Sequence, residues 1–173
     1  PSKLTGGVLG GSIIRGKLKL GDRIEIRPGA AGKHKPLKTE IVGLKKAGIE
    51  LEEAGAGGLL GIMTRLDPYL TKSDSLVGNI VGLEGSLPNS LDAVTIQTKL
   101  LARPGMKQAG LKLGDMLLIN SGTARSVGTI ETMKKDMMGL KLRIPIVAEK
   151  GDKIVLSKKI EESWRLVGLG TVL

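Results

Sequence analysis

The feature that most limits the fold of this chain is the spacing of its 26 glycines, which recur every few residues along 173 positions. Each glycine inside a helix costs about 1 kcal/mol, so uninterrupted amphipathic helices of three turns are hard to place. Short strands joined by glycine-bearing turns fit this spacing better. The chain is therefore expected to be all-β.

The clearest strand pattern lies between Gly6 and Gly29. An apolar run over Val8–Ile14 ends at Gly16, and Gly21-Asp22 leads into Arg23–Arg27, where charged and apolar residues alternate. Alternation at period two predicts a strand with its apolar face buried and its charged face in water.

Two sets of strands are expected, separated by a linker. The segment Gly82–Asp92 contains Pro, Asn and Ser together, which indicates the linker and gives two domains, residues 1–86 and 87–173. Several short strands with turn signals between them favour barrels or sandwiches. The expected strands are Val8–Ile14, Arg23–Arg27, Lys38–Lys45, Leu59–Thr64 and Leu76–Val81 in the first domain, and Val94–Leu101, Met116–Ile119, Ser126–Met133, Leu140–Ile146, Ile154–Ser157 and Trp164–Leu169 in the second.

One local turn occurs three times. Gly21-Asp22, Gly114-Asp115 and Gly151-Asp152 each precede an alternating strand. Glycine allows a positive φ and aspartate hydrogen-bonds to nearby backbone, so both domains are predicted to reuse one turn.

Composition restricts the partners and the chemistry. The chain has 27 basic and 17 acidic residues, a net charge of +10 that favours a polyanionic partner such as nucleic acid. It has no cysteine, which excludes disulfides and thiolate metal sites and fits a reducing, cytoplasmic location. Tyr69 and Trp164 are the only aromatic residues, so the core must be Leu, Ile, Val and Met. Trp164 is expected to be buried, and its replacement by Ala to cost roughly 3–5 kcal/mol.

No catalytic, metal or nucleotide site is evident in the residues. Gly11–Leu18 matches most of a P-loop, but Leu18 stands where Ser or Thr must coordinate magnesium. His34 is the only histidine, so neither a His-activated nucleophile nor a multi-histidine metal site can be built, and a solvated loop position is expected for it. Glu50, Glu52 and Glu53 are interpreted as a solvated turn. The chain is predicted not to be an enzyme and to hold no cofactor or metal.

Several runs resemble the gamma subunit of archaeal and eukaryotic translation initiation factor 2. Those similar to its second domain are Gly6–Gly29, Thr39–Val42, Gly57–Ile62 and Thr64–Lys72, and those similar to its third are Arg143–Asp152 and Ser163–Gly168. The resemblance implies two consecutive small β-barrels of the domain II and domain III type of translational GTPases. It also implies that the first strand of the first barrel, and the GTPase domain that binds GTP and magnesium, are not in the sequence.

The resemblance further implies binding of initiator methionyl-tRNA and its delivery to the small ribosomal subunit, in a GTP-dependent heterotrimer with alpha and beta subunits and without a membrane. Carried over by position, the tRNA-binding residues are Lys45, Lys46, Gly57, Gly58 and Arg65. The alpha-subunit contact falls on Arg27, Lys33, His34 and Lys35.

Other interpretations stay open at this point. The chain is also compatible with the barrel pair of another translational GTPase that carries a different aminoacyl-tRNA, or with a small enzyme that has a barrel active site. Gly55–Gly58 fits a site of close backbone approach and a plain barrel corner equally well.

Overall fold

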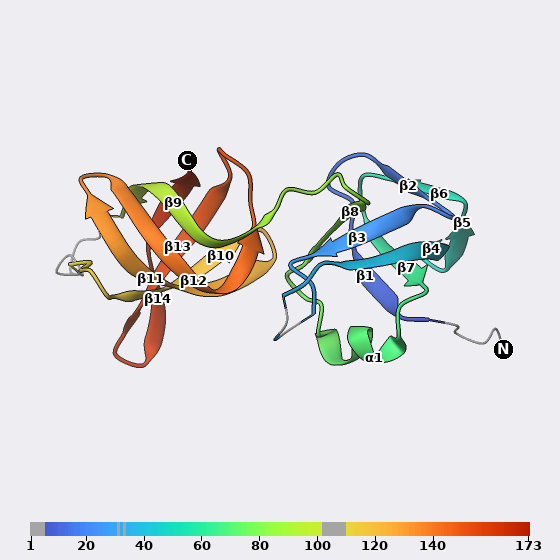
Figure 1. Ribbon diagram of the computed structural model, residues 1–173, viewed down its shortest axis with the longest axis horizontal. Helices are drawn as coiled ribbons and strands as arrows, with labels where there is room; N and C mark the ends of the chain where they lie inside the picture. Colours follow the sequence, from blue (N-terminus) through green and yellow to red (C-terminus); the bar gives the residue numbers. More distant parts are fainter. Residues whose placement is uncertain (1–5, 31, 33, 102–109) are drawn as a thin grey trace. The chain divides into compact units, whose positions relative to one another are not determined.

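The computed structural model describes residues 6–30, 32, 34–101 and 110–173, and it divides into two compact units, 1–87 and 88–173 (Figure 1). Nearly all regular structure in both units is β-strand. The prediction of an all-β chain is confirmed. None of the helices among the described residues is long and apolar enough to span a membrane.

The first unit contains one main antiparallel sheet with strand order β1-β7-β4-β3-β8; β5 pairs with β4, and β2 with β6 apart from this path. Among the described residues, β1 and β8 therefore end this path, and β5 likewise has a partner on one side only. Its elements are β1 (Val8–Ser12), β2 (Lys17–Lys19), β3 (Arg23–Arg27), β4 (Leu37–Lys46), β5 (Ile49–Leu51), β6 (Glu53–Gly55), β7 (Leu59–Thr64), helix α1 (Pro68–Thr71), the 3-10 turn η1 (Lys72–Asp74) and β8 (Ile80–Leu83).

The second unit is a closed six-stranded barrel with the order β10-β11-β12-β9-β14-β13. All its neighbouring strands are antiparallel. Its strands are β9 (Ser90–Leu100), β10 (Met116–Ser121), β11 (Ala124–Lys134), β12 (Met137–Val147), β13 (Lys153–Ile160) and β14 (Ser163–Val172). The closed ring confirms the barrel prediction for the second unit.

Three predicted segments in the first unit were placed wrongly. The strand expected over Val8–Ile14 ends at Ser12, and the strand expected over Leu76–Val81 begins only at Ile80. A turn in which the Asn79 N–H donates to the Leu76 carbonyl occupies the earlier positions. The linker expected over Gly82–Asp92 is shorter, because β8 continues to Leu83 and β9 begins at Ser90.

The repeated Gly-Asp turn is confirmed in detail. In each copy the aspartate carboxylate accepts a hydrogen bond from the backbone N–H three residues earlier: Lys19 at 2.8 Å, Lys112 at 3.0 Å and Glu149 at 2.8 Å. In each copy, too, the glycine N–H donates to a carbonyl of a second strand, and that residue's N–H donates back to the aspartate carbonyl. The three glycines have φ of 82°, 85° and 94°. One turn thus attaches a β-strand to a second strand in both units.

The interpretation of β3 as a strand with a solvated charged face is wrong at Glu25, which is 1% exposed. Its carboxylate lies 3.3 Å from Arg27 Nη2 and accepts a hydrogen bond of 3.3 Å from the Leu87 N–H. The segment after β8 covers this face: a Cβ on Gly82, which pairs with Glu25, would lie 2.6 Å from the Leu87 side chain.

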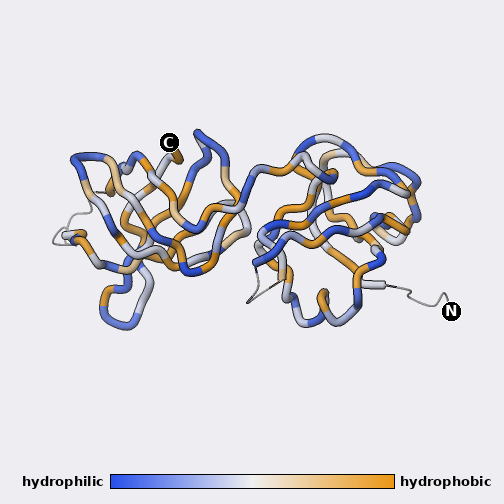
Figure 2. The backbone as a smooth tube through the Cα atoms, in the orientation of Figure 1, coloured by the Kyte–Doolittle hydropathy of each residue, from blue (hydrophilic) through white to orange (hydrophobic). Residues whose placement is uncertain are grey.

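Aliphatic residues form both cores, as composition predicted. The largest fully buried side chains include Ile24, Ile26 and Ile41 in the first unit and Ile96, Ile119 and Ile154 in the second. In Figure 2 the strands carry most of the hydrophobic residues and the turns are mostly hydrophilic.

The expectation that Trp164 is buried is wrong, since it is 44% exposed. It pairs with Lys159 across the β13–β14 hairpin. Among the described residues neither strand has a partner on its other side at this level, because β10 pairs with β13 only as far as Lys158 and β9 pairs with β14 only from Gly168 onward. Figure 1 shows the hairpin extending past the body of its own barrel. Within the part of the chain that the structure describes, no third strand therefore flanks the hairpin at Trp164.

Candidate nucleic-acid interface

The structure brings four of the five predicted tRNA-binding residues to one end of the first unit. Lys45 and Lys46 end β4, and the next residues, Ala47 and Gly48, both have positive φ and turn the chain into β5. The Lys46 ammonium donates a hydrogen bond of 2.9 Å to the carbonyl of Gly57. Both lysines are exposed.

Gly57 and Gly58 form the loop between β6 and β7, with φ of 103° and 69°. The Gly57 N–H donates to the Ile13 carbonyl at 3.2 Å, which fixes the loop to the segment after β1. A Cβ on Gly58 would lie 2.8 Å from Lys46 Cε. The lysine stem therefore lies across backbone that carries no side chain.

Three exposed aliphatic residues border this loop and were not predicted as site residues. Ile14, Ile49 and Leu59 are 89%, 65% and 73% exposed. Ile14 follows the residue that accepts the Gly57 hydrogen bond, Ile49 pairs with Lys46, and Leu59 directly follows Gly58. Aliphatic residues in or beside an alternating run are normally assigned to the core. In the sequence, only a nearby glycine distinguishes Ile14, Ile49 and Leu59 from core residues.

Arg65 lies away from the other four. It follows β7, where its Nε is 3.2 Å from Glu40 Oε2 and its N–H donates to Thr39 Oγ1 at 3.2 Å. Glu40 and Lys46 are six residues apart on β4, or about 20 Å along a strand. The predicted set is thus divided between the two ends of β4.

The predicted alpha-subunit contact lies on the loop between β3 and β4. Arg27 has a side chain only 17% exposed and lies beside the Glu25 carboxylate, while Lys35 is exposed. His34 has a φ of 46°, and its N–H donates to the Ala30 carbonyl at 3.1 Å. Lys33 lies outside the described residues.

One acidic residue near this end of the unit, Glu53, forms two ion pairs. Glu53 lies 2.7 Å from the Lys17 ammonium and 3.1 Å from that of Lys19. Their hydrogen bonds hold the pKa of the Glu53 carboxyl below its ordinary value. In the part of the chain that the structure describes, no three His, Asp or Glu residues are grouped so that they could hold a metal ion.

Comparisons with known proteins match each unit to a family. Residues 6–83 match the family model described as elongation factor Tu domain 2, and residues 92–172 match the model described as initiation factor eIF2 gamma, C terminal.

Curated relatives cover the two units together. Proteins named translation initiation factor 2 subunit gamma are 46% identical in Pyrococcus abyssi and 47% identical in Pyrococcus furiosus, each over 99% of this chain. The corresponding protein of Methanocaldococcus jannaschii is 45% identical over 98% of it. The chain spans about 44% of the length of these relatives.

Proposed function

Since the first unit belongs to the elongation factor Tu domain 2 family and the second to the eIF2 gamma C-terminal family, and the chain is related along its length to archaeal gamma subunits, we propose that it acts in translation initiation. Its first unit would bind the aminoacylated end of initiator methionyl-tRNA. The second unit would take part in delivering this tRNA to the small ribosomal subunit.

The observation that carries the proposal is the hydrogen bond from Lys46 to Gly57, which joins a lysine pair to a loop of bare backbone. Lys45 and Lys46 would neutralise phosphates near the end of the acceptor stem. The exposed aliphatic residues Ile14, Ile49 and Leu59 offer an apolar surface beside these charges. A terminal nucleoside esterified to an apolar amino acid has both the charged and the apolar part that such a surface suits.

The wider assembly follows from the family. We expect the loop that carries His34 and Lys35 to contact an alpha subunit, and the complete factor to include a beta subunit and a domain that binds GTP and magnesium. In this proposal the residues of this chain bind and orient tRNA. No residue is assigned a catalytic role.

Binding of initiator tRNA at rising salt tests the proposal. This chain alone is expected to bind weakly. Adding the GTPase domain of an archaeal gamma subunit is expected to restore a preference for the methionylated form over the deacylated form. If about six phosphates are neutralised, affinity falls roughly 10³-fold between 50 and 200 mM salt. Tight binding that does not respond to salt contradicts the proposal, and equal preference for an elongator aminoacyl-tRNA indicates another translational GTPase.

The double variant Lys45→Glu, Lys46→Glu tests where the tRNA binds. Because both side chains are exposed, the changes should cost less than about 0.5 kcal/mol of stability while replacing attraction to phosphate with repulsion. The matched control is Lys134→Glu, Lys135→Glu in the second unit, with both lysines also exposed. If the two variants lose tRNA affinity equally at matched thermal midpoints, binding depends only on the net charge of the chain. That result would refute this site.

A further inference from the structure

The Lys46 side chain lies over the glycine loop of the first unit. Its ammonium donates a hydrogen bond of 2.9 Å to the Gly57 carbonyl, and a Cβ built on Gly58 would lie 2.8 Å from Lys46 Cε and 3.1 Å from Lys46 Nζ. The end of the lysine therefore already occupies the space that a side chain at Gly58 would fill. A ligand that approaches the Gly58 backbone from this side must first displace Lys46.

The glycine loop does not depend on Lys46 for its position. The Gly57 N–H donates to the Ile13 carbonyl at 3.2 Å, and this backbone bond joins the loop to the segment after β1. The turn that follows Lys46 is formed by Ala47 and Gly48, both with positive φ. Loop and lysine are thus held by separate backbone contacts, so the hydrogen bond between them can break without a change in either segment.

The bond from Lys46 to Gly57 is weak enough for a ligand to replace it. Both residues are exposed, so water competes for the ammonium and for the carbonyl, and the net stabilisation by such a bond is small. Holding a lysine side chain in one conformation also costs conformational entropy. An anionic phosphate oxygen attracts the ammonium more strongly than an uncharged carbonyl does, so phosphate is the better acceptor.

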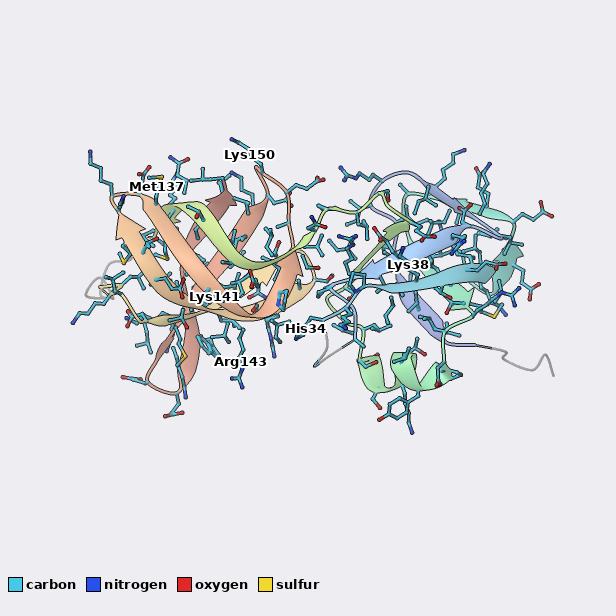
Figure 3. The ribbon with its side chains drawn as sticks, viewed as in Figure 1. His34, Lys38, Met137, Lys141, Arg143 and Lys150 are labelled. Carbon is cyan, nitrogen blue, oxygen red and sulfur yellow. The ribbon has the colours of Figure 1, made fainter. Side chains whose placement is uncertain are left out.

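The charge of Lys46 is not neutralised within the described residues, where its ammonium has the Gly57 carbonyl as acceptor and no carboxylate. Lys38, near the opposite end of β4, instead lies 2.7 Å from the Glu84 carboxylate (Figure 3). A lysine that is already paired with a carboxylate must give up one ion pair to form another. Lys46 gives up only a hydrogen bond to a neutral oxygen when it moves to a phosphate.

We infer that Lys46 is a movable cover that makes the glycine loop selective for ligands that carry phosphate. A phosphate beside the loop attracts the ammonium away from Gly57, and the new ion pair offsets the lost hydrogen bond. A ligand without phosphate must break the same hydrogen bond with no ion pair to offset it. The inference rests on the proposed function, since it concerns the same loop, and it names the residue that discriminates between these two classes of ligand.

The test compares two probes in NMR titrations of this chain. One is adenosine joined to methionine by an amide, which has no phosphate, and the other is the CCA trinucleotide joined to methionine in the same way, which has phosphates. Lys46→Ala should raise the affinity for the phosphate-free probe severalfold, because no hydrogen bond then has to be broken, and should reduce the preference for the trinucleotide. An unchanged or lower affinity of Lys46→Ala for the phosphate-free probe would overturn the inference.

The matched control is Lys45→Ala, which removes the same charge one residue earlier, at a position that pairs with Gly61. It should weaken binding of the trinucleotide and leave the affinity for the phosphate-free probe unchanged. A rise in that affinity as large as the rise in Lys46→Ala would mean that removing any nearby positive charge has this effect, and the cover would be refuted.

Proton exchange in the free chain separates failure of the cover from failure of the proposed function. Hydrogen-bonded groups exchange their protons with water more slowly, so the Lys46 ammonium should exchange more slowly than that of Lys45. In Lys46→Ala the Gly57 amide should keep its protection, since its bond to Ile13 remains. Equal exchange of the two ammonium groups, or loss of protection at Gly57, would overturn the cover alone. Binding of neither probe by the wild type or by Lys46→Ala would overturn the proposed function as well.

Discussion

The two units use the same local turn and the same kind of aliphatic core, but they differ in how their strands close. The second unit joins strands of 6 to 11 residues into a continuous six-stranded ring. The first combines strands of 3 to 10 residues in an open path with a separate two-stranded sheet. A closed ring pairs every strand on both sides, whereas an open path leaves edges and loops. The candidate tRNA site lies on such loops.

Because of this difference, the second unit is a closed scaffold, while the first unit has exposed loops at the end that carries the candidate site. In the second unit nearly all residues of the strands are paired, and a buried serine is hydrogen-bonded to the bulged segment of β12. In the first, short strands leave Ile14, Ile49 and Leu59 exposed around two glycines with positive φ. The proposed binding surface of the first unit thus depends on strands that end early.

Removing a core side chain should have the largest effect. Ile24→Ala and Ile119→Ala each empty a fully buried position, one in each unit, and should cost roughly 2–5 kcal/mol. Because the units have separate cores, hydrogen-exchange protection should fall only in the unit that carries the change. Loss of protection in both units from either variant would show that the two cores unfold together.

Removing the buried carboxylate of the first unit should cost less. Glu25→Ala takes away the ionic partner of Arg27 and the acceptor of the Leu87 N–H, for a loss of roughly 2 kcal/mol. The control is Glu53→Ala, which breaks two ion pairs between solvent-exposed side chains and should cost clearly less than Glu25→Ala. Urea unfolding measures both, and an equal cost would mean that burial of Glu25 contributes nothing.

The three Gly-Asp turns allow a matched comparison across the units. Alanine at Gly21, Gly114 or Gly151 meets no atom within 4 Å of its Cβ, so the cost is the left-handed backbone alone, about 1 kcal/mol each. Alanine at Gly10, equally free of neighbours but without a positive φ, should be close to neutral. Thermal midpoints of the four variants test this prediction. Unequal losses of stability among the three turns would show that the same turn contributes differently to the stability of the two units.

The sequence was sufficient for features set by local chemistry and insufficient for those set by neighbours. The Gly-Asp turn needs only its own residues and one partner strand, and alternation with aliphatic residues was enough to predict two β units. The burial of Glu25 depends on Leu87, which is 62 residues away. Likewise, Lys46 and Gly57 were assigned to one site only through a family resemblance, since nothing in their spacing predicts the hydrogen bond between them.

The smallest effect is expected at Trp164, where composition alone predicted one of the largest. The chain's only tryptophan would normally supply core area, but this one lies on the part of the β13–β14 hairpin that no third strand of the described residues flanks. With 44% of its surface exposed, Trp164→Ala should cost about 1 kcal/mol or less instead of the 3–5 kcal/mol of a buried ring. Fluorescence of the folded chain should be quenched readily by acrylamide and emit near the wavelength of tryptophan in water. Blue-shifted, protected emission would mean that the hairpin folds back onto its barrel, and the contrast between a closed scaffold and projecting loops would then no longer hold for the second unit.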